Sequence, residues 1–311
     1  MENSGRVSLP VAGKGVKSQS MGPANKRDQE LARVRRMRQH QKVAMGFLWG
    51  AALLTVAMLL LIIGYILAKG VPHITWEFLT GAVKGMGDEG GIFPVLVNTL
   101  YFIGLTMVIA APLGVMAAIY LVEYAKETRM VRLIRFCTEN LAGMPSIIFG
   151  LFGFIFFGKM FGLSYSLLNG ALTATVLILP TIIRTSEEAL RAVPMSYREG
   201  SLALGATQLR TIRSVVLPAA SGGIISGLLL SIGRIVGETA ALFLTLGSGT
   251  YIATSLTKSA RSLALHLYTL AREGISEDMA FATATVLVVV VVGINIGANT
   301  WVRHLEKKRT T

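Results

Sequence analysis

Six long apolar segments dominate the sequence and restrict the chain to a membrane fold. Each is close to the ~20 residues that a helix needs to cross a bilayer core of ~30 Å. Because backbone polar groups find no water partners in hydrocarbon, each segment must be helical. The composition agrees, with 52% hydrophobic and only 15% charged residues. The sequence therefore predicts an all-α polytopic membrane protein with six transmembrane helices, at about 44–68, 92–122, 133–158, 166–184, 219–246 and 279–302.

Basic residues are distributed unevenly among the polar segments that separate these helices. Of the 30 Lys and Arg residues, 23 fall on the side that holds both termini and segment 186–218, six fall on the opposite side, and Arg234 lies inside a span. Cytoplasmic loops are enriched in Lys and Arg, so we predict that both termini and segment 186–218 face the cytoplasm. The net charge of +13 would also fit a nucleic-acid-binding protein, but this distribution argues against that class.

Composition also divides the chain into three parts. Residues 1–43 are a basic tail that we expect to be largely disordered and cytoplasmic. Residues 44–305 are the transmembrane domain, and residues 306–311 are a short cytoplasmic tail. Cys137 is the single cysteine and the four histidines are scattered at segment ends, so neither a disulfide framework nor a metal site is expected.

Segment 186–218 is the one polar segment between two spans that is long enough to form a functional surface. We predict that it folds as two short helices. Ser196-x-x-Glu199 has the spacing of a capping box, which opens a helix. Gly205 stops that helix, and a second short helix follows and closes at Pro218. The expected product is a cytoplasmic helix-turn-helix elbow (residues 186–218) with an exposed apolar ridge.

Two charged residues stand inside the fifth span. Arg234 and Glu238 are four residues apart, which places them on one face of a helix. Arginine in hydrocarbon costs at least ~2.5 kcal/mol, so Arg234 must either line a polar path for substrate or form a structural ion pair. Arg184, at the predicted cytoplasmic end of the fourth span, is either a cation at the exit of that path or a positive-inside anchor.

Two glycine pairs and one acidic residue inside the spans indicate which helix faces contact protein. Gly223-x3-Gly227 and Gly233-x3-Gly237 predict smooth faces for close helix packing in the fifth span. In the third span, Glu139 must face protein or a water-filled path.

A near match to a nucleotide-binding loop occurs over 153–159, but it lacks the necessary residues. Met160 replaces the required Ser or Thr, and four bulky apolar residues fill the turn that would hold phosphates. We therefore do not expect this chain to bind nucleotide or to act as an enzyme, and ATP-driven transport would require a separate ATPase.

The elbow resembles the EAA loop of ABC importer permeases, whose pattern is E-A-A-x3-G-x9-I-x-L-P. Glu199, Gly205 and Pro218 match its spacing residue for residue, whereas Gly200 and Ser201 replace the paired alanines. In that family the loop fits a groove on the ATPase subunit. The resemblance implies that the ATPase-coupling residues are Glu199, Gly200, Ser201, Leu202, Gly205, Leu217 and Pro218.

Three further stretches narrow this resemblance. They start at Gly114, Gly143 and Gly233, and with the elbow they resemble the PstA-type permease of the phosphate ABC importer over about residues 44–305. The specific part is the Arg-x-x-Gly-Glu-Thr run beginning at Arg234, which the PstC-type sister permease shares. The resemblance implies the type I importer permease fold and a substrate path that includes Arg234, Glu238 and Arg184.

The resemblance also implies a set of partners. These are a PstC-type sister permease that forms a heterodimer, two copies of an ATPase at the cytoplasmic face, and an extracytoplasmic phosphate-binding protein. ATP and Mg would be bound by the ATPase, with no cofactor on this chain. Three alternatives stay open: a permease for another oxyanion such as sulfate or molybdate, a passive anion channel, and a secondary transporter. The channel would not need the elbow, and the secondary transporter should show inverted repeats, of which we find none.

Overall fold

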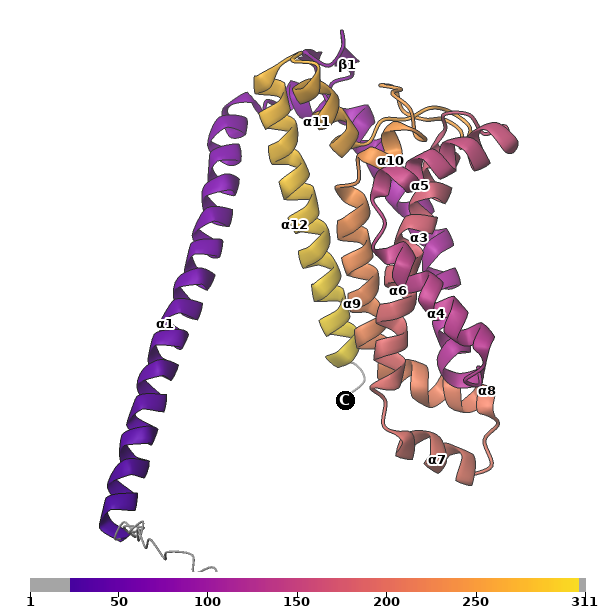
Figure 1. The fold of residues 1–311 in the computed structure, drawn as a ribbon. Helices are drawn as coiled ribbons and strands as arrows, with labels where there is room; N and C mark the ends of the chain where they lie inside the picture. Colours follow the sequence, from indigo (N-terminus) through magenta and orange to yellow (C-terminus); the bar gives the residue numbers. More distant parts are fainter. Residues whose placement is uncertain (1–22, 308–311) are drawn as a thin grey trace, which may run out of the picture. The chain divides into compact units, whose positions relative to one another are not determined.

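The computed structural model describes residues 23–307, most of which are helical (Figure 1). Contacts divide the chain into a first unit that ends at Ile63 and a second unit that begins at Gly64. One helix, α1 (Pro23–Gly70), contains residues of both units and includes the described part of the predicted basic tail. Residues 1–22 of that tail and residues 308–311 of the C-terminal tail lie outside the described residues.

The second unit contains all the other elements. In chain order these are η1 (Val71–His73), α2 (Trp76–Thr80), β1 (Val83–Lys84), β2 (Glu89–Gly90), α3 (Phe93–Ile119), η2 (Tyr120–Tyr124), α4 (Arg129–Ala142), α5 (Ser146–Gly153), η3 (Phe154–Met160), α6 (Leu167–Arg191), α7 (Met195–Ala203), α8 (Gln208–Thr211), η4 (Ile212–Val216), α9 (Leu217–Val236), α10 (Ala240–Phe243), α11 (Leu263–Arg272) and α12 (Glu277–Lys307). Elements η2, η3 and η4 are π-helical turns.

Five helices are long and apolar enough to cross a membrane, which confirms five of the six predicted spans. They cover Ala44–His73, Phe93–Tyr124, Leu167–Arg191, Gln208–Val236 and Glu277–Gly297. The third predicted span, 133–158, is present as two helices rather than one straight helix. Helices α4 and α5 meet there at a bend of 106°, and only the bent pair taken together gives a sixth span.

Pro145 explains the bend between α4 and α5. Proline lacks the backbone N–H that a continuing helix needs, and it pushes the preceding residue out of the helical region. Helix α4 also carries three arginines and a strong amphipathic pattern, so by itself it is not a lipid-facing segment.

Helix α6 is the central helix of the second unit, since it packs against both α3 and α9. Its N-terminus is capped by Ser166, whose hydroxyl accepts from the backbone N–H of Asn169 at 3.1 Å. The predicted smooth face at Gly223 and Gly227 is confirmed: a Cβ on either residue would overlap Ala189 or Thr185 of α6. At Gly233 and Gly237 no atom from another described part of the chain lies within 4 Å of the Cβ position, so neither glycine packs closely against another helix of this chain.

The two ends of this bundle differ in structure (Figure 1). One end carries α7 and α8, and we call it the elbow end. The other, the hairpin end, carries α11 and the β1–β2 hairpin, in which Val83 pairs with Gly90. Long-range hydrogen bonds tie the loop after α10 to α3. Asn98 donates to the carbonyl of Tyr251 at 2.8 Å and accepts from the backbone N–H of Ala253 at 2.9 Å.

His266 of α11 gives the hairpin end a predicted pH dependence. Burial, and then the charge of Arg261, lower the pKa of His266 from 6.5 to about 4. Between these pH values His266 is protonated in the unfolded chain but largely unprotonated in the folded chain. Stability is therefore complete above pH 6.5 and falls as the pH drops toward about 4. The shift corresponds to about 3 kcal/mol. We expect the melting temperature of the solubilised protein to fall over this range.

The matched variant is His266→Gln, whose amide oxygen accepts a hydrogen bond from Arg261 without titrating. Its melting temperature should fall less between pH 7 and pH 4 than that of the parent protein. Equal falls in the two proteins would assign the effect to other titrating groups.

Candidate substrate path and coupling elbow

Arg234 lies in the last turn of α9 and faces a pocket formed by α6, α9 and α12. The pocket has a volume of about 550 Å³. Its lining residues are Thr181, Ser226, Leu229, Leu230, Gly233, Arg234 and Asn295. The guanidinium Nη1 donates to the hydroxyl of Thr181 at 3.3 Å, and no ion pair involves Arg234 within residues 23–307. Its charge is therefore not neutralised by a carboxylate in this structure.

Glu238 does not pair with Arg234, and the predicted helical relation between them is wrong. Helix α9 ends at Val236, so Glu238 lies beyond it and does not share its face. Its carboxylate instead accepts from the backbone N–H of Ala241 at 3.1 Å, at the start of α10. The cause is the loss of helical geometry at Gly237, the C-cap of α9.

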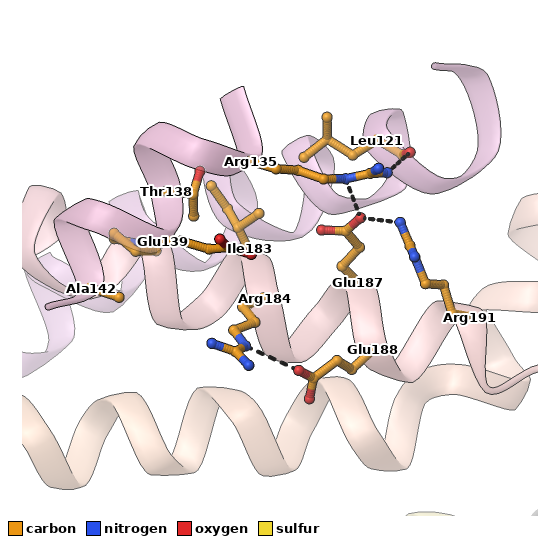
Figure 2. A pocket seen from close by; sticks show the side chains of 11 residues that line it. Leu121, Arg135, Thr138, Glu139, Ala142, Ile183, Arg184, Glu187, Glu188 and Arg191 are labelled. Atoms are coloured by element: carbon orange, nitrogen blue, oxygen red, sulfur yellow. Dashed lines mark hydrogen bonds and ion pairs between the residues drawn. The ribbon is translucent and has the colours of Figure 1, made fainter. Parts of the chain in front are cut away.

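Arg184 lines a different pocket, of about 240 Å³, whose lining residues come from η2, α4 and α6 (Figure 2). Its Nε donates to Glu188 at 3.1 Å, and both side chains are 66% exposed. The structure therefore places Arg184 and Arg234 in two separate pockets that share helix α6. Glu139 also lines the Arg184 pocket, which confirms the expectation that this acid faces a polar space.

The Arg184 pocket contains an ion-pair network that sequence reasoning missed (Figure 2). Glu187 accepts from Arg135 at 3.1 Å and from Arg191 at 2.7 Å. Arg135 also donates to Glu127 at 2.7 Å, and this hydrogen bond and the charge of Arg135 hold the pKa of Glu127 below its usual value. The network joins α4 to α6, and α5 and η3 lie between these two helices in the sequence.

The elbow folds as two short helices, α7 and α8, as predicted, with Gly205 at the turn. Gly205 has a φ of +83°, a left-handed conformation that favours glycine. The predicted capping box is wrong: α7 begins at Met195 with Pro194 as its N-cap, and no side chain caps it. Ser196 consequently lies inside the helix. The two helices are joined by a hydrogen bond between the hydroxyls of Ser201 and Thr211 at 2.9 Å.

The elbow also differs from the prediction at its C-terminal boundary. Pro218 does not close the second helix, because Gln208–Val236 runs as one helix into the fifth span. The π-helical turn η4 precedes Pro218 and provides the wider geometry in which a missing N–H is tolerated. Leu217 and Pro218 are half-buried in the first turn of α9, and Ser201 is also half-buried.

The predicted apolar ridge of the elbow is present. Glu199, Gly200, Leu202 and Gly205 are exposed, and Leu204 beside them is 91% exposed. The other exposed large apolar side chains of α7 and α8 are Met195, Tyr197 and Leu209. Isolated exposed apolar residues are normal, but several of them within one short segment are typical of a protein interaction surface.

A buried ion pair that was not predicted holds the elbow to the bundle. Arg198 of α7 donates from Nε and Nη2 to Glu123 at 3.1 and 2.7 Å, and also donates to the carbonyls of Val193 and Leu190 at 2.7 and 2.9 Å. The side chains of Arg198 and Glu123 are only 12% and 7% exposed. Gln208 of α8 donates to the carbonyl of Glu123 at 2.6 Å. One residue of η2, the turn that follows α3, therefore positions both elbow helices.

We expect Glu123→Gln to loosen the elbow without unfolding the bundle. Removing one partner of a buried ion pair costs about 3 kcal/mol or more. Trypsin should cleave the solubilised variant faster at Arg210. The matched control is Glu127→Gln, since Glu127 is 69% exposed and its pair with Arg135 lies outside the elbow. Equal cleavage rates in the two variants would contradict a positioning role for Glu123.

A family model described as "Binding-protein-dependent transport system inner membrane component" matches residues 110–311. This range includes α6, the elbow and Arg234. The chain therefore belongs to this family, the membrane-spanning permeases of ABC importers. As a member, it is a multi-pass membrane protein and a non-catalytic subunit of a transporter.

Sequence relatives place the chain more closely within the family. It is 34% identical over 286 residues to the probable ABC transporter permease protein YqgI of Bacillus subtilis, covering 87% of this chain and 97% of the relative. It is 38% identical to phosphate transport system permease protein PstA 1 of Mycobacterium tuberculosis, covering 68% and 70%. PstA of Haemophilus influenzae is 28% identical, covering 85% and 94%. These matches confirm the PstA-type resemblance.

Solved structures confirm the type I importer permease fold. A chain of a bacterial alginate ABC transporter in complex with its alginate-bound periplasmic protein has a TM-score of 0.63 at 15% identity, covering 85% of this chain and 97% of that one. A chain of the inward-facing MetNI methionine ABC transporter has a TM-score of 0.56 at 23% identity, covering 69% and 94%. At these identities the likeness concerns the fold alone.

Proposed function

We propose that this chain is the PstA-type permease subunit of an ATP-driven importer of inorganic phosphate. The observation that carries the proposal is Arg234, a guanidinium that has no ion-pair partner among the described residues and lines a pocket between three membrane helices. Phosphate near pH 7 carries about −1.5 charge and several strong acceptor oxygens. The arginine guanidinium stays charged near pH 7 and can donate two parallel hydrogen bonds to such an anion.

The proposed assembly has four kinds of subunit. A PstC-type sister permease completes the translocation path, two ATPase copies bind ATP and Mg, and an extracytoplasmic protein delivers phosphate. The exposed ridge of α7 supports an ATPase contact at the elbow, with Glu199, Gly200, Ser201, Leu202 and Gly205 as contact residues and Leu217 and Pro218 as their helical support. The charge distribution supports a cytoplasmic elbow end, cytoplasmic termini and an external hairpin end.

The test of this function is transport by the purified assembly. The chain is co-expressed with its neighbouring subunits, purified from membranes and reconstituted in liposomes with ATP inside. Labelled phosphate should enter, and phosphate should stimulate ATP hydrolysis. Entry that needs no ATP would instead indicate a passive anion channel. Uptake of sulfate or molybdate, with no uptake of phosphate, would show that the substrate is a different oxyanion.

Glu238 and Arg184 are proposed as further residues of the path. Glu238→Gln keeps an oxygen that accepts from Ala241 and so keeps the start of α10, but it removes the charge. We expect it to lower uptake by about tenfold with normal assembly, which corresponds to about 1.4 kcal/mol. Glu238→Leu should lower the amount of assembled complex as well. Normal uptake by Glu238→Gln would show that the charge of Glu238 has no role in the path, and that its role is limited to the hydrogen bond at the start of α10.

A further inference from the structure

A third pocket lies at the hairpin end of the bundle. It has a volume of about 700 Å³, and α11, the loop after α10 and the hairpin contribute to its lining. The lining residues that matter here are Tyr165, Ser248, Thr250, Ser259, Arg261 and Glu273. None of them belongs to the Arg234 pocket or to the elbow.

Arg261 is the unusual residue of this pocket. It is only 8% exposed, and its Nη1 donates to Nδ1 of His266 at 3.3 Å. Its Nε is buried and has no hydrogen-bond partner among the described residues. A buried donor that lacks an acceptor costs free energy, and a buried unpaired charge costs more. The structure therefore contains a guanidinium that lacks an anion.

Neighbouring groups do not supply that anion. No ion pair joins Arg261 to a carboxylate within residues 23–307; Glu273 lines the same pocket and raises the pKa of Arg261 only by its charge, while burial lowers it more strongly. His266 offers only a neutral ring, because its lowered pKa keeps it unprotonated near pH 7. Arg261 thus lines the pocket as a charged group with no ion-pair partner among the described residues.

The pocket offers other donors near Arg261. The backbone N–H groups of Gly247, Ser248 and Thr250 make no hydrogen bond within the described part of the chain, and neither do the hydroxyls of Ser248 and Thr250. The hydroxyl of Ser259 already accepts from the N–H of Gly249 at 3.1 Å, and its own proton remains available. The lining therefore combines one cation with several neutral donors.

We propose that Arg261 and the loop over 247–250 form an entry site for inorganic phosphate at the hairpin end. This site rests on the proposed function and extends it, because it adds a second anion site, nearer the external end, to the path that contains Arg234. A tetrahedral oxyanion has four oxygens that can accept from donors on different sides, as this lining presents them. Glu273 opposes anion binding, so the site holds phosphate weakly and releases it.

The experiment measures binding of labelled inorganic phosphate to the purified complex without the delivering protein. The background is Arg234→Gln, which weakens the other anion site. We expect this complex to bind phosphate, with about tenfold weaker binding after Arg261→Gln is added. The matched control is Lys258→Gln, which removes an equal charge from an exposed residue of the same loop. It should leave phosphate binding unchanged.

Three results would overturn the proposal. Phosphate binding that is unchanged by Arg261→Gln would exclude the site. An equal loss in Lys258→Gln would indicate general attraction by positive charge. Normal phosphate binding in Arg261→Gln, together with weaker binding of the delivering protein, would show that Arg261 receives an acidic side chain of that protein.

A second measurement covers the case in which Arg261→Gln does not fold. Phenylglyoxal modifies guanidinium groups, and mass spectrometry reports its reaction at each arginine. Phosphate should slow the modification of Arg261 in the parent complex, whereas chloride should not. An equal rate with and without phosphate would contradict the site. ATP-driven phosphate uptake by the parent complex tests the proposed function separately, so that failure of one proposal is distinguishable from failure of the other.

Discussion

Replacing Arg234 by glutamine is expected to lower phosphate uptake by about ten- to a hundredfold while the complex still assembles. A hydrogen bond to a charged group contributes about 1.5–3 kcal/mol, and each 1.4 kcal/mol corresponds to tenfold. Glutamine keeps a donor for Thr181 but loses the charge that an anion requires. Assembly should survive because Arg234 is exposed and makes no ion pair in the described part of the chain. Uptake and the amount of assembled complex are measured separately.

Two variants sharpen this test. Arg234→Lys keeps the charge but not the planar fork, so it should recover only part of the uptake. Lys258→Gln changes the net charge equally in an exposed loop and should transport normally. Normal uptake by Arg234→Gln would remove Arg234 from the path. Parallel loss of uptake and assembly would assign it a structural role instead.

Substituting Gly205 by leucine is expected to uncouple the elbow from the ATPase. The left-handed backbone at this turn costs a residue with a Cβ about 1–2 kcal/mol, and no neighbouring side chain offsets that cost. The turn should shift and displace the exposed ridge beside it. We expect less co-purified ATPase and at least about a tenfold loss of uptake, with normal insertion into the membrane.

A graded series separates backbone strain from side-chain bulk. Gly205→Asn should be milder than Gly205→Leu, because asparagine tolerates the left-handed region. Ser196→Ala is the control inside α7. Ser196 is exposed and is not one of the proposed contact residues, and alanine is at least as favourable as serine within a helix. Full uptake and normal ATPase content in Gly205→Leu would show that the elbow is not the coupling contact.

Local patterns in the sequence predicted much of this structure. Apolar length alone identified five spans, because a helix must be that long to cross a bilayer. Gly205 and the Gly223-x3-Gly227 face were also predicted correctly, since each reflects a steric demand within a few residues. A helix break at Pro145 also follows from the sequence, but the 106° angle between the two halves depends on how they pack.

Features that depend on contacts distant in sequence were not predicted. Glu123 and Arg198 are separated by 75 residues, and their pairing depends on how α3 and α6 pack. Arg261 was counted only as a basic residue of an external loop, since its burial arises from the fold around it. Glu238 was misplaced because four-residue spacing implies a shared face only while the helix continues. Gly237, three residues after Arg234, was the feature of the sequence that could have indicated the end of the helix.

The unbroken helix Gln208–Val236 has a mechanical consequence. Gln208 donates to Glu123 in η2 beside the elbow. Arg234 lies 26 residues further along the same helix, about 39 Å away at 1.5 Å per residue. A rod of this kind acts as a lever: a tilt of about 5° at one end displaces the other by about 3 Å. That displacement is comparable with the 3.3 Å between Arg234 and Thr181 on the neighbouring helix. A small push on the elbow is thus enough to break or remake the contact that holds the guanidinium.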